Sequence, residues 1–176
     1  EEDMSDKPAS ISQNPPQAED QIHRLERQYR KRLQSLQAVD EMVANLVQQL
    51  TTLGQLDNTY IFFTSDNGYH MGEHRLPQGK NTPYEEDIRV PLLVLGPDVE
   101  AGTVVTDLTG NIDLAPTFAE LANVTAPAFV DGRSLVPFLR GTPVGDWRAA
   151  FLLERGSQSA ATSMNFLPTP NSTITV

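Results

Sequence analysis

The centre of the sequence is Tyr60-Ile-Phe-Phe-Thr-Ser-Asp-Asn-Gly-Tyr-His-Met-Gly-Glu-His-Arg-Leu-Pro-Gln-Gly-Lys80. Its apolar start is typical of a buried strand, and the strand end is followed at once by a carboxylate, Asp66, an amide, Asn67, and a glycine, Gly68. Open α/β sheets bind their ligands at the ends of strands. Because Lys80 lies in the same loop, the stretch offers an oxygen pair and an ammonium group to one anionic ligand.

The tripeptide Asp66-Asn-Gly68 has an alternative interpretation, since this is also a common turn sequence. Two features favour a metal site. A buried strand precedes the tripeptide, and the loop after it is longer than compact domains usually keep without a function. Carboxylate and amide oxygens are the donors that Ca²⁺ and Mg²⁺ prefer. An ammonium at Lys80 suits a sulfate or phosphate bound beside such a cation.

The same loop carries two histidines and a glutamate. His70 and His74 have the spacing of a helical metal-binding pair, but the glycines and the proline around them disfavour a helix. We therefore expect both histidines to line or support a pocket, with metal ligation as the alternative. Glu73 is a candidate general acid or base, and a surface carboxylate is the favoured alternative.

The composition excludes several classes of protein. A net charge of −10 and a pI near 4.6 argue against nucleic-acid binding, which needs clustered Lys and Arg. The absence of cysteine excludes disulfides, thiolate metal sites and a cysteine nucleophile within these residues. No apolar run approaches the length of about 18 residues that a membrane-spanning helix needs.

The part of the chain before the central stretch is predicted to be mainly helical. Residues 1–20 are rich in Pro, Ser and Gln and predict a surface loop. Apolar residues spaced by three or four from Ile22 to Leu53 predict a long amphipathic helix that ends at Gly54. We interpret its basic residues, Arg24 to Arg32, as a solvated face opposite a side that packs on a sheet. A polyanion-binding stripe and a coiled coil are the alternatives.

The pattern predicts an α/β fold with a mainly parallel sheet flanked by helices. The expected strands are 59–64, buried on both faces, 92–95, 103–106 and 148–154. Asp113 is the expected N-cap of a helix that reaches about Ala122, and 135–139 predicts a shorter helix. We predict one domain over 1–155 and a loop or disordered tail over 156–176.

Several motifs together resemble one family. The most specific are Thr64-Ser-Asp-Asn-Gly-Tyr-His-Met-Gly-Glu-His74 with Lys80, Tyr84-Glu-Glu-Asp-Ile-Arg-Val-Pro-Leu-Leu-Val94 and Gly96-Pro97. Weaker ones are Glu2-Asp-Met-Ser-Asp-Lys-Pro8, Arg30-Lys-Arg32, Val39-Asp-Glu-Met-Val43, Asn111-Ile-Asp-Leu-Ala-Pro-Thr117 and Asp131-Gly-Arg-Ser-Leu135. Up to about residue 154 the sequence resembles the second half of the catalytic domain of type I sulfatases. The branch of N-acetylglucosamine-6-sulfatases and arylsulfatases is the most similar.

The resemblance implies a partial domain of alkaline-phosphatase-like fold that takes part in the hydrolysis of aryl or amino-sugar sulfate esters. It implies that Asp66 and Asn67 bind Ca²⁺, with Mg²⁺ less favoured, and that Lys80 binds the sulfate, with His70 as a second substrate-binding residue. The family uses a formylglycine nucleophile from a Cys/Ser-x-Pro-x-Arg motif. That motif is absent from these residues, so we expect the nucleophile and the remaining metal ligands upstream.

Three further expectations follow. The isolated 176 residues should expose apolar sheet surface and be poorly soluble or associated. The glycosylation patterns at Asn123-Val-Thr125 and Asn171-Ser-Thr173 fit a secreted, periplasmic or lysosomal protein. The rival functions are a phosphate or phosphonate monoester hydrolase of the same superfamily and a non-catalytic fragment that is inactive alone.

Overall fold

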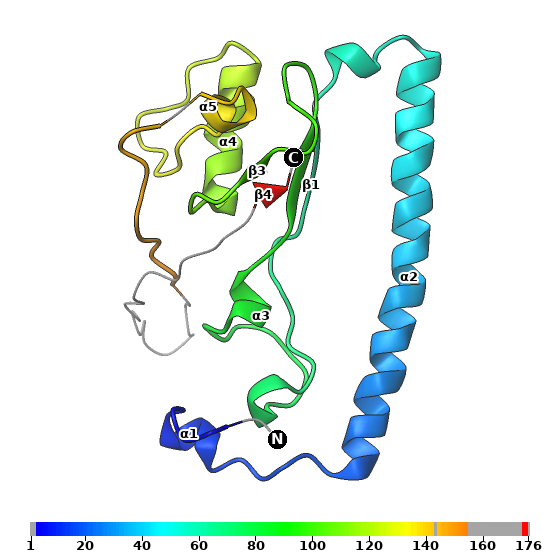
Figure 1. The fold of residues 1–176 in the computed structure, drawn as a ribbon, viewed down its shortest axis with the longest axis vertical. Coiled ribbons are helices and arrows are strands. Elements are labelled where there is room, and N and C mark those ends of the chain that lie inside the picture. The colour runs from blue at the N-terminus through cyan, green and yellow to red at the C-terminus, as the bar shows by residue number, and fades with distance from the viewer. Residues whose placement is uncertain (1–2, 143, 155–173, 176) are drawn as a thin grey trace. The chain divides into compact units, whose positions relative to one another are not determined.

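The structure is a computed structural model that describes residues 3–142, 144–154 and 174–175 (Figure 1). The chain forms two compact units. The first unit consists of Glu1–Leu56 and Asn67–Ile88, and the second of Asp57–Asp66 and Arg89–Val176. The chain therefore passes from the second unit to the first between Asp66 and Asn67, and each unit is described by itself.

The first unit is dominated by α2, Glu19–Thr52, a helix of 34 residues (Figure 1). At its start, the Ala18 amide donates to Gln21 Oε1 at 2.9 Å. At its end, Gly54 takes a left-handed φ of 65° and lets the Gln55 amide reach the Leu50 carbonyl at 2.8 Å. The predicted long helix and its glycine stop are confirmed.

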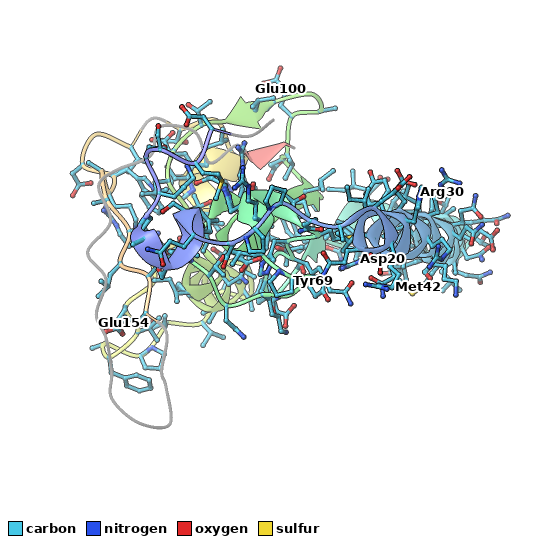
Figure 2. The ribbon with its side chains drawn as sticks, turned by 90° about the horizontal axis from the view of Figure 1, so that it is seen from below. Asp20, Arg30, Met42, Tyr69, Glu100 and Glu154 are labelled. Atoms are coloured by element: carbon cyan, nitrogen blue, oxygen red, sulfur yellow. The ribbon has the colours of Figure 1, made fainter. Side chains whose placement is uncertain are left out.

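The apolar side of α2 has no buried residue among those that the structure describes. Figure 2, which views the helix nearly end-on, shows side chains all round it, with Asp20, Arg30 and Met42 labelled. We call the following exposed residues the apolar stripe of α2: Ile22, Tyr29, Leu33, Leu36 and Leu46. The expected packing of this side on the sheet stays a prediction, because the helix and the sheet belong to different units.

We expect the 176-residue chain to self-associate through this stripe, since exposed contiguous apolar surface favours association. Glutamine at Leu33, Leu36 and Leu46 should shift the chain toward monomer in sedimentation experiments. Glutamine has nearly the helix propensity of leucine, so α2 itself should persist. Glutamine at the exposed Arg27, Lys31 and Glu41 is the matched control and should leave the association unchanged. A monodisperse, cooperatively melting wild-type monomer would contradict the expectation.

The rest of the first unit consists of short elements. Helix α1, Ala9–Ser12, lies within the segment predicted as a loop, and Met4 beside it is buried, so that prediction was only partly right. The other short elements of this unit are η2, Glu73–Arg75, and α3, Glu85–Ile88. The short helix η1, Leu56–Asn58, begins at the last residue of this unit's first segment and continues into the second unit. No helix among the described residues is both long and apolar enough to span a bilayer.

The second unit contains a four-stranded sheet in the order β1-β2-β4-β3. The strands are β1, Ile61–Thr64, β2, Leu92–Leu95, β3, Val104–Val105, and β4, Ile174–Thr175. The β1 and β2 strands pair antiparallel, as do β3 and β4, and only β2 with β4 pairs parallel. The α/β class is confirmed, whereas the mainly parallel pairing is not present among these strands.

Two strand predictions need correction. Phe63 in β1 is 39% exposed, so β1 is not buried on both faces in this unit. No strand spans 148–154, where only Leu153 forms an isolated backbone bridge. Two side chains of this segment pack on the unit. Arg148 binds Asp113, and Phe151 lies so close to Gly110 that a Cβ there would be 2.4 Å from its ring. The predicted tail lies outside the described residues, except for β4.

The core of the second unit lies between short helices. These are η3, Asn111–Asp113, α4, Leu114–Leu121, and α5, Val136–Leu139, which confirm the predicted helices. Val105, Leu135 and Phe138 form the buried cluster, and the rings of Phe138 and Trp147 meet edge to face at 4.7 Å. This packing holds the segment after α5 against that helix.

Asp113 joins these elements through its carboxylate. Asp113 occupies the predicted N-cap position of α4, but its fully buried side chain makes no capping hydrogen bond to that helix. It accepts from the amides of Gly110 and Arg133 at 2.9 and 2.8 Å, and its two oxygens bind the two terminal nitrogens of Arg148. A buried charge needs such partners, so Asp113 holds three separate segments together.

Replacing Asp113 with asparagine should lower the stability of the second unit by about 3–5 kcal/mol, because it leaves the Arg148 guanidinium without its carboxylate. Urea unfolding followed by the fluorescence of Trp147, the one tryptophan of the sequence, measures this loss. Asp131→Asn, at an exposed acidic residue of the same unit, is the control. Equal unfolding midpoints for the two variants would show that the buried ion pair contributes nothing.

Candidate anion-binding loop

The central loop is closed at its base by backbone pairing. His70 and Gly79 form an antiparallel bridge, with amide-to-carbonyl distances of 2.9 and 3.0 Å in the two directions. Residues 71–78 therefore form an excursion that includes η2. Lys80 follows the bridge directly, so its backbone position is tied to that of His70.

The predicted metal-binding residues are held by their own units. In the second unit, the Asn111 side chain donates to the carbonyls of Ser65 and Asp66 at 3.0 and 3.2 Å and fixes the end of the segment after β1. In the first unit, the Asn67 amide group donates to the Gly68 carbonyl at 2.7 Å. Asp66 is exposed and Asn67 is half-buried.

The structure brings Lys80 to Asn67. The ammonium of Lys80 donates to Asn67 Oδ1 at 3.0 Å. Lys80 is exposed, so this contact lies where a ligand from solvent has access. The two residues were predicted to serve one ligand on spacing and resemblance, and their side chains are in contact.

His70 occupies a buried position beside Asp87. Only 4% of each residue is exposed, and His70 Nδ1 lies 2.8 and 3.0 Å from the two carboxylate oxygens. The same carboxylate accepts from the His70 amide at 3.0 Å and from the amide and hydroxyl of Thr82 at 2.7 and 2.6 Å. Burial acts to raise the pKa of Asp87, but the hydrogen bonds from Thr82 and His70 prevail and lower that pKa below its ordinary value.

Sequence reasoning missed Asp87 and Asn111. Asp87 stands in the acidic run Glu85-Glu-Asp87, where nothing separates a buried acid from two neighbours on the surface. Asn111 belongs to one of the weaker motifs of the family resemblance, which gave it no function. Both act through bonds to residues that are distant in the sequence, and such bonds leave no local pattern.

His74 and Glu73 have separate surroundings. The His74 ring stacks on Tyr84 with ring centroids 3.8 Å apart, and its Nε2 lies 3.2 Å from a carboxylate oxygen of Glu86. His74 and Arg75 take left-handed φ angles of 55° and 54°, so this is a tight turn and not a helix that pairs the histidines. Glu73 is exposed and accepts from the Met71 amide.

Gly68 lets the start of the loop pass against α3. Its amide donates to the Asp87 carbonyl at 2.8 Å, and a Cβ at this position would lie 2.0 Å from the Glu86 carbonyl oxygen. Only glycine fits such an approach without moving backbone. Gly68 thus sets the distance between Asn67 and the segment that carries Asp87.

Gly68→Ala should therefore destabilise the loop by about 1–3 kcal/mol, the usual cost of overpacking. Hydrogen exchange of peptides from 67–88 should become faster in this variant. Gly145→Ala is the matched control, because no atom lies within 4 Å of an added Cβ there. Unchanged protection in Gly68→Ala would mean that α3 shifts without cost.

The donor types fit a hard cation, but the described residues do not complete a site. The Asp66 carboxylate and Asn67 Oδ1 are oxygen ligands of the kind that Ca²⁺ prefers. Asn67 Oδ1 accepts a hydrogen bond from Lys80, and an amide oxygen can accept more than one such contact. Within 3–142 and 144–154, no group of three or more His, Asp or Glu side chains is arranged to hold a metal ion.

The structure is thus part of an α/β protein in which a carboxylate, an amide and an ammonium group follow one strand in a single loop. The family model for sulfatases matches residues 3–124. The extracellular sulfatase SULF-1 homolog of Drosophila melanogaster is 49% identical over 127 residues, 70% of this chain and 11% of that protein. N-acetylglucosamine-6-sulfatase of Homo sapiens is 45% identical over 140 residues, 79% of this chain and 25% of that protein. The chain belongs to the sulfatase family.

Solved structures agree with this assignment. BT4656, solved in complex with its substrate D-glucosamine-2-N,6-O-disulfate, matches 73% of this chain at a TM-score of 0.64 and 38% identity. The phosphonate monoester hydrolase SpPMH from Silicibacter pomeroyi matches 66% at a TM-score of 0.62 and the same 38% identity. This chain covers 26% and 23% of those two chains, so it corresponds to a part of each.

Proposed function

We propose that the protein containing this chain hydrolyses sulfate esters, and that the loop after β1 supplies one side of its sulfate and cation site. In this proposal Asp66 and Asn67 are cation ligands, and Lys80 and His70 bind the substrate. The observation that carries it is the 3.0 Å hydrogen bond between the Lys80 ammonium and Asn67 Oδ1 in a chain of the sulfatase family.

The residues of this chain have binding roles in the proposed reaction. Lys80 donates to a non-bridging sulfate oxygen and neutralises part of its charge. His70 presents its Nε2 to the same group, while its Nδ1 is held by Asp87. A bound Ca²⁺ adds positive charge against the sulfate oxygens, and Mg²⁺ is the less favoured ion. The nucleophile, a formylglycine by family resemblance, comes from outside these residues.

The proposed substrates are sulfate esters of amino sugars or aryl alcohols. Relatives named as N-acetylglucosamine-6-sulfatases and arylsulfatases, together with the glucosamine disulfate bound to BT4656, support this class. We further propose a secreted, periplasmic or lysosomal location. Two relatives are named extracellular sulfatases, and the Asn123-Val-Thr125 glycosylation pattern is exposed. Asn171 lies outside the described residues.

Substitution in the full-length enzyme tests the roles of Lys80 and Asp66. Lys80→Ala should lower kcat/KM for 4-nitrophenyl sulfate by about 10²–10³-fold, the usual effect of removing one group that stabilises developing charge. Asp66→Ala should weaken reactivation by added Ca²⁺ after chelation. Lys31→Ala, at an exposed position of α2, is the control for charge. Normal activity in Lys80→Ala or Asp66→Ala would contradict the corresponding role.

A second function within the superfamily is hydrolysis of phosphonate or phosphate monoesters. The 38% identity to SpPMH over 66% of this chain supports phosphonate hydrolysis as the alternative function. The two functions are distinguished by measuring kcat/KM of one full-length preparation with 4-nitrophenyl sulfate, with phenyl phosphonate esters and with phenyl phosphate esters. A higher kcat/KM for the phosphorus esters would favour the alternative. We expect the 176 residues alone to be inactive with all of these substrates.

A further inference from the structure

We propose that Asp87 is a positioning residue, whose buried carboxylate orients the His70 imidazole toward the substrate and ties down the segment that carries Lys80. This inference rests on the proposed function, since it assigns Asp87 to the same substrate-binding loop. Asp87 is only 4% exposed. Its carboxylate is hydrogen-bonded to His70 and Thr82, so we assign it no direct contact with the substrate.

The first part of the argument is the orientation of His70. An ionised carboxylate can only accept hydrogen bonds, so His70 Nδ1 must carry the proton that it shares with Asp87. The other ring nitrogen, Nε2, then faces away from the carboxylate. No described residue makes a hydrogen bond to Nε2, and Gly79 lies beside it without a side chain to cover it. A Cβ at Gly79 would lie 3.3 Å from Nε2.

The second part is the placement of Lys80. On one side of it, Gly79 is bridged to His70. On the other side, Thr82 gives its amide and its hydroxyl to Asp87 Oδ2. Because His70 also binds Asp87, both ends of the short segment from Gly79 to Thr82 return to one carboxylate. Asn81 within it has a left-handed φ of 76°, which fits a tight turn closed at both ends.

The Asp87 carboxylate accepts more hydrogen bonds than an asparagine side chain at this position could accept. Four groups, the amide and Nδ1 of His70 and the amide and hydroxyl of Thr82, converge on the two oxygens of Asp87. Asparagine at position 87 would offer one oxygen and one NH₂ group, which meets these donors with further donors. Asp87→Asn therefore keeps the size of the side chain and removes its ability to hold both partners.

The test is a double-mutant cycle in the full-length enzyme with 4-nitrophenyl sulfate. His70→Asn retains an amide donor near the Nδ1 position, toward Asp87, but has no group at the Nε2 position. Each of Asp87→Asn and His70→Asn should lower kcat/KM by about 10–100-fold, the size of effect seen when a partner that orients a ligand is lost. Because Asp87 acts through His70, adding Asp87→Asn to His70→Asn should cost less than about threefold more.

Two controls separate positioning from folding. Glu85→Gln removes a neighbouring exposed acid of α3 and should leave kcat/KM unchanged. Melting temperatures show whether a variant is folded, and His70→Asn should still melt cooperatively, at a temperature lowered by the smaller side chain at this buried position. If Asp87→Asn does not fold, Thr82→Val takes its place in the cycle. It removes one donor to Asp87, and should lower kcat/KM severalfold in the wild type but not in His70→Asn.

The outcomes are distinguishable. Losses that multiply in the double variant would overturn the inference, as would full activity in His70→Asn. If the wild type hydrolyses sulfate esters and Lys80→Ala impairs it, but the cycle shows no coupling, only the role of Asp87 is wrong. If the wild type does not turn over sulfate esters, the proposed function fails and the inference fails with it.

Discussion

The Asp87 carboxylate is the interaction on which the central loop depends. The carboxylate accepts hydrogen bonds from the amides of His70 and Thr82, which lie on either side of the excursion from Met71 to Gln78. These bonds take the place of the regular pairing that a strand or helix would give. A buried carboxylate is stable only when hydrogen bonds compensate its lost hydration. The loop and the charge therefore stabilise each other. Asp113 has the same function in the second unit, where one carboxylate joins Gly110, Arg133 and Arg148.

The elements that local sequence determines were predicted well. The spacing of apolar residues gave α2 and its end at Gly54, and the apolar run after Pro91 gave β2 with its bounds. The contact between Asn67 and Lys80 agrees with the interpretation of Asp66 to Lys80 as one ligand-binding loop. In each case the deciding information lies within a few residues or in a motif that a whole family shares.

The predictions that failed depend on long-range choices. The apolar segment 148–154 has the composition of a strand, but Arg148 binds the buried Asp113 carboxylate and Phe151 packs against Gly110. The direction of strand pairing depends on which strands become neighbours, and the sequence of β1 is compatible with either direction. Asp87 could not be separated from Glu85 and Glu86 because its partners, His70 and Thr82, come from the preceding loop.

The hydrogen bonds of the central loop also bear on how the protein folds. Those that gather on Asp87 join residues 17 and 5 positions apart, whereas Gln17 reaches the carbonyl of Gly72 across 55 positions and Asn111 reaches that of Asp66 across 45. The entropy lost on closing a chain segment grows with its length. The loop can therefore assemble early from its own residues. The contact of Gln17 with the loop and that of Asn111 with the end of the strand segment would then form late, because they need distant parts of the chain to meet.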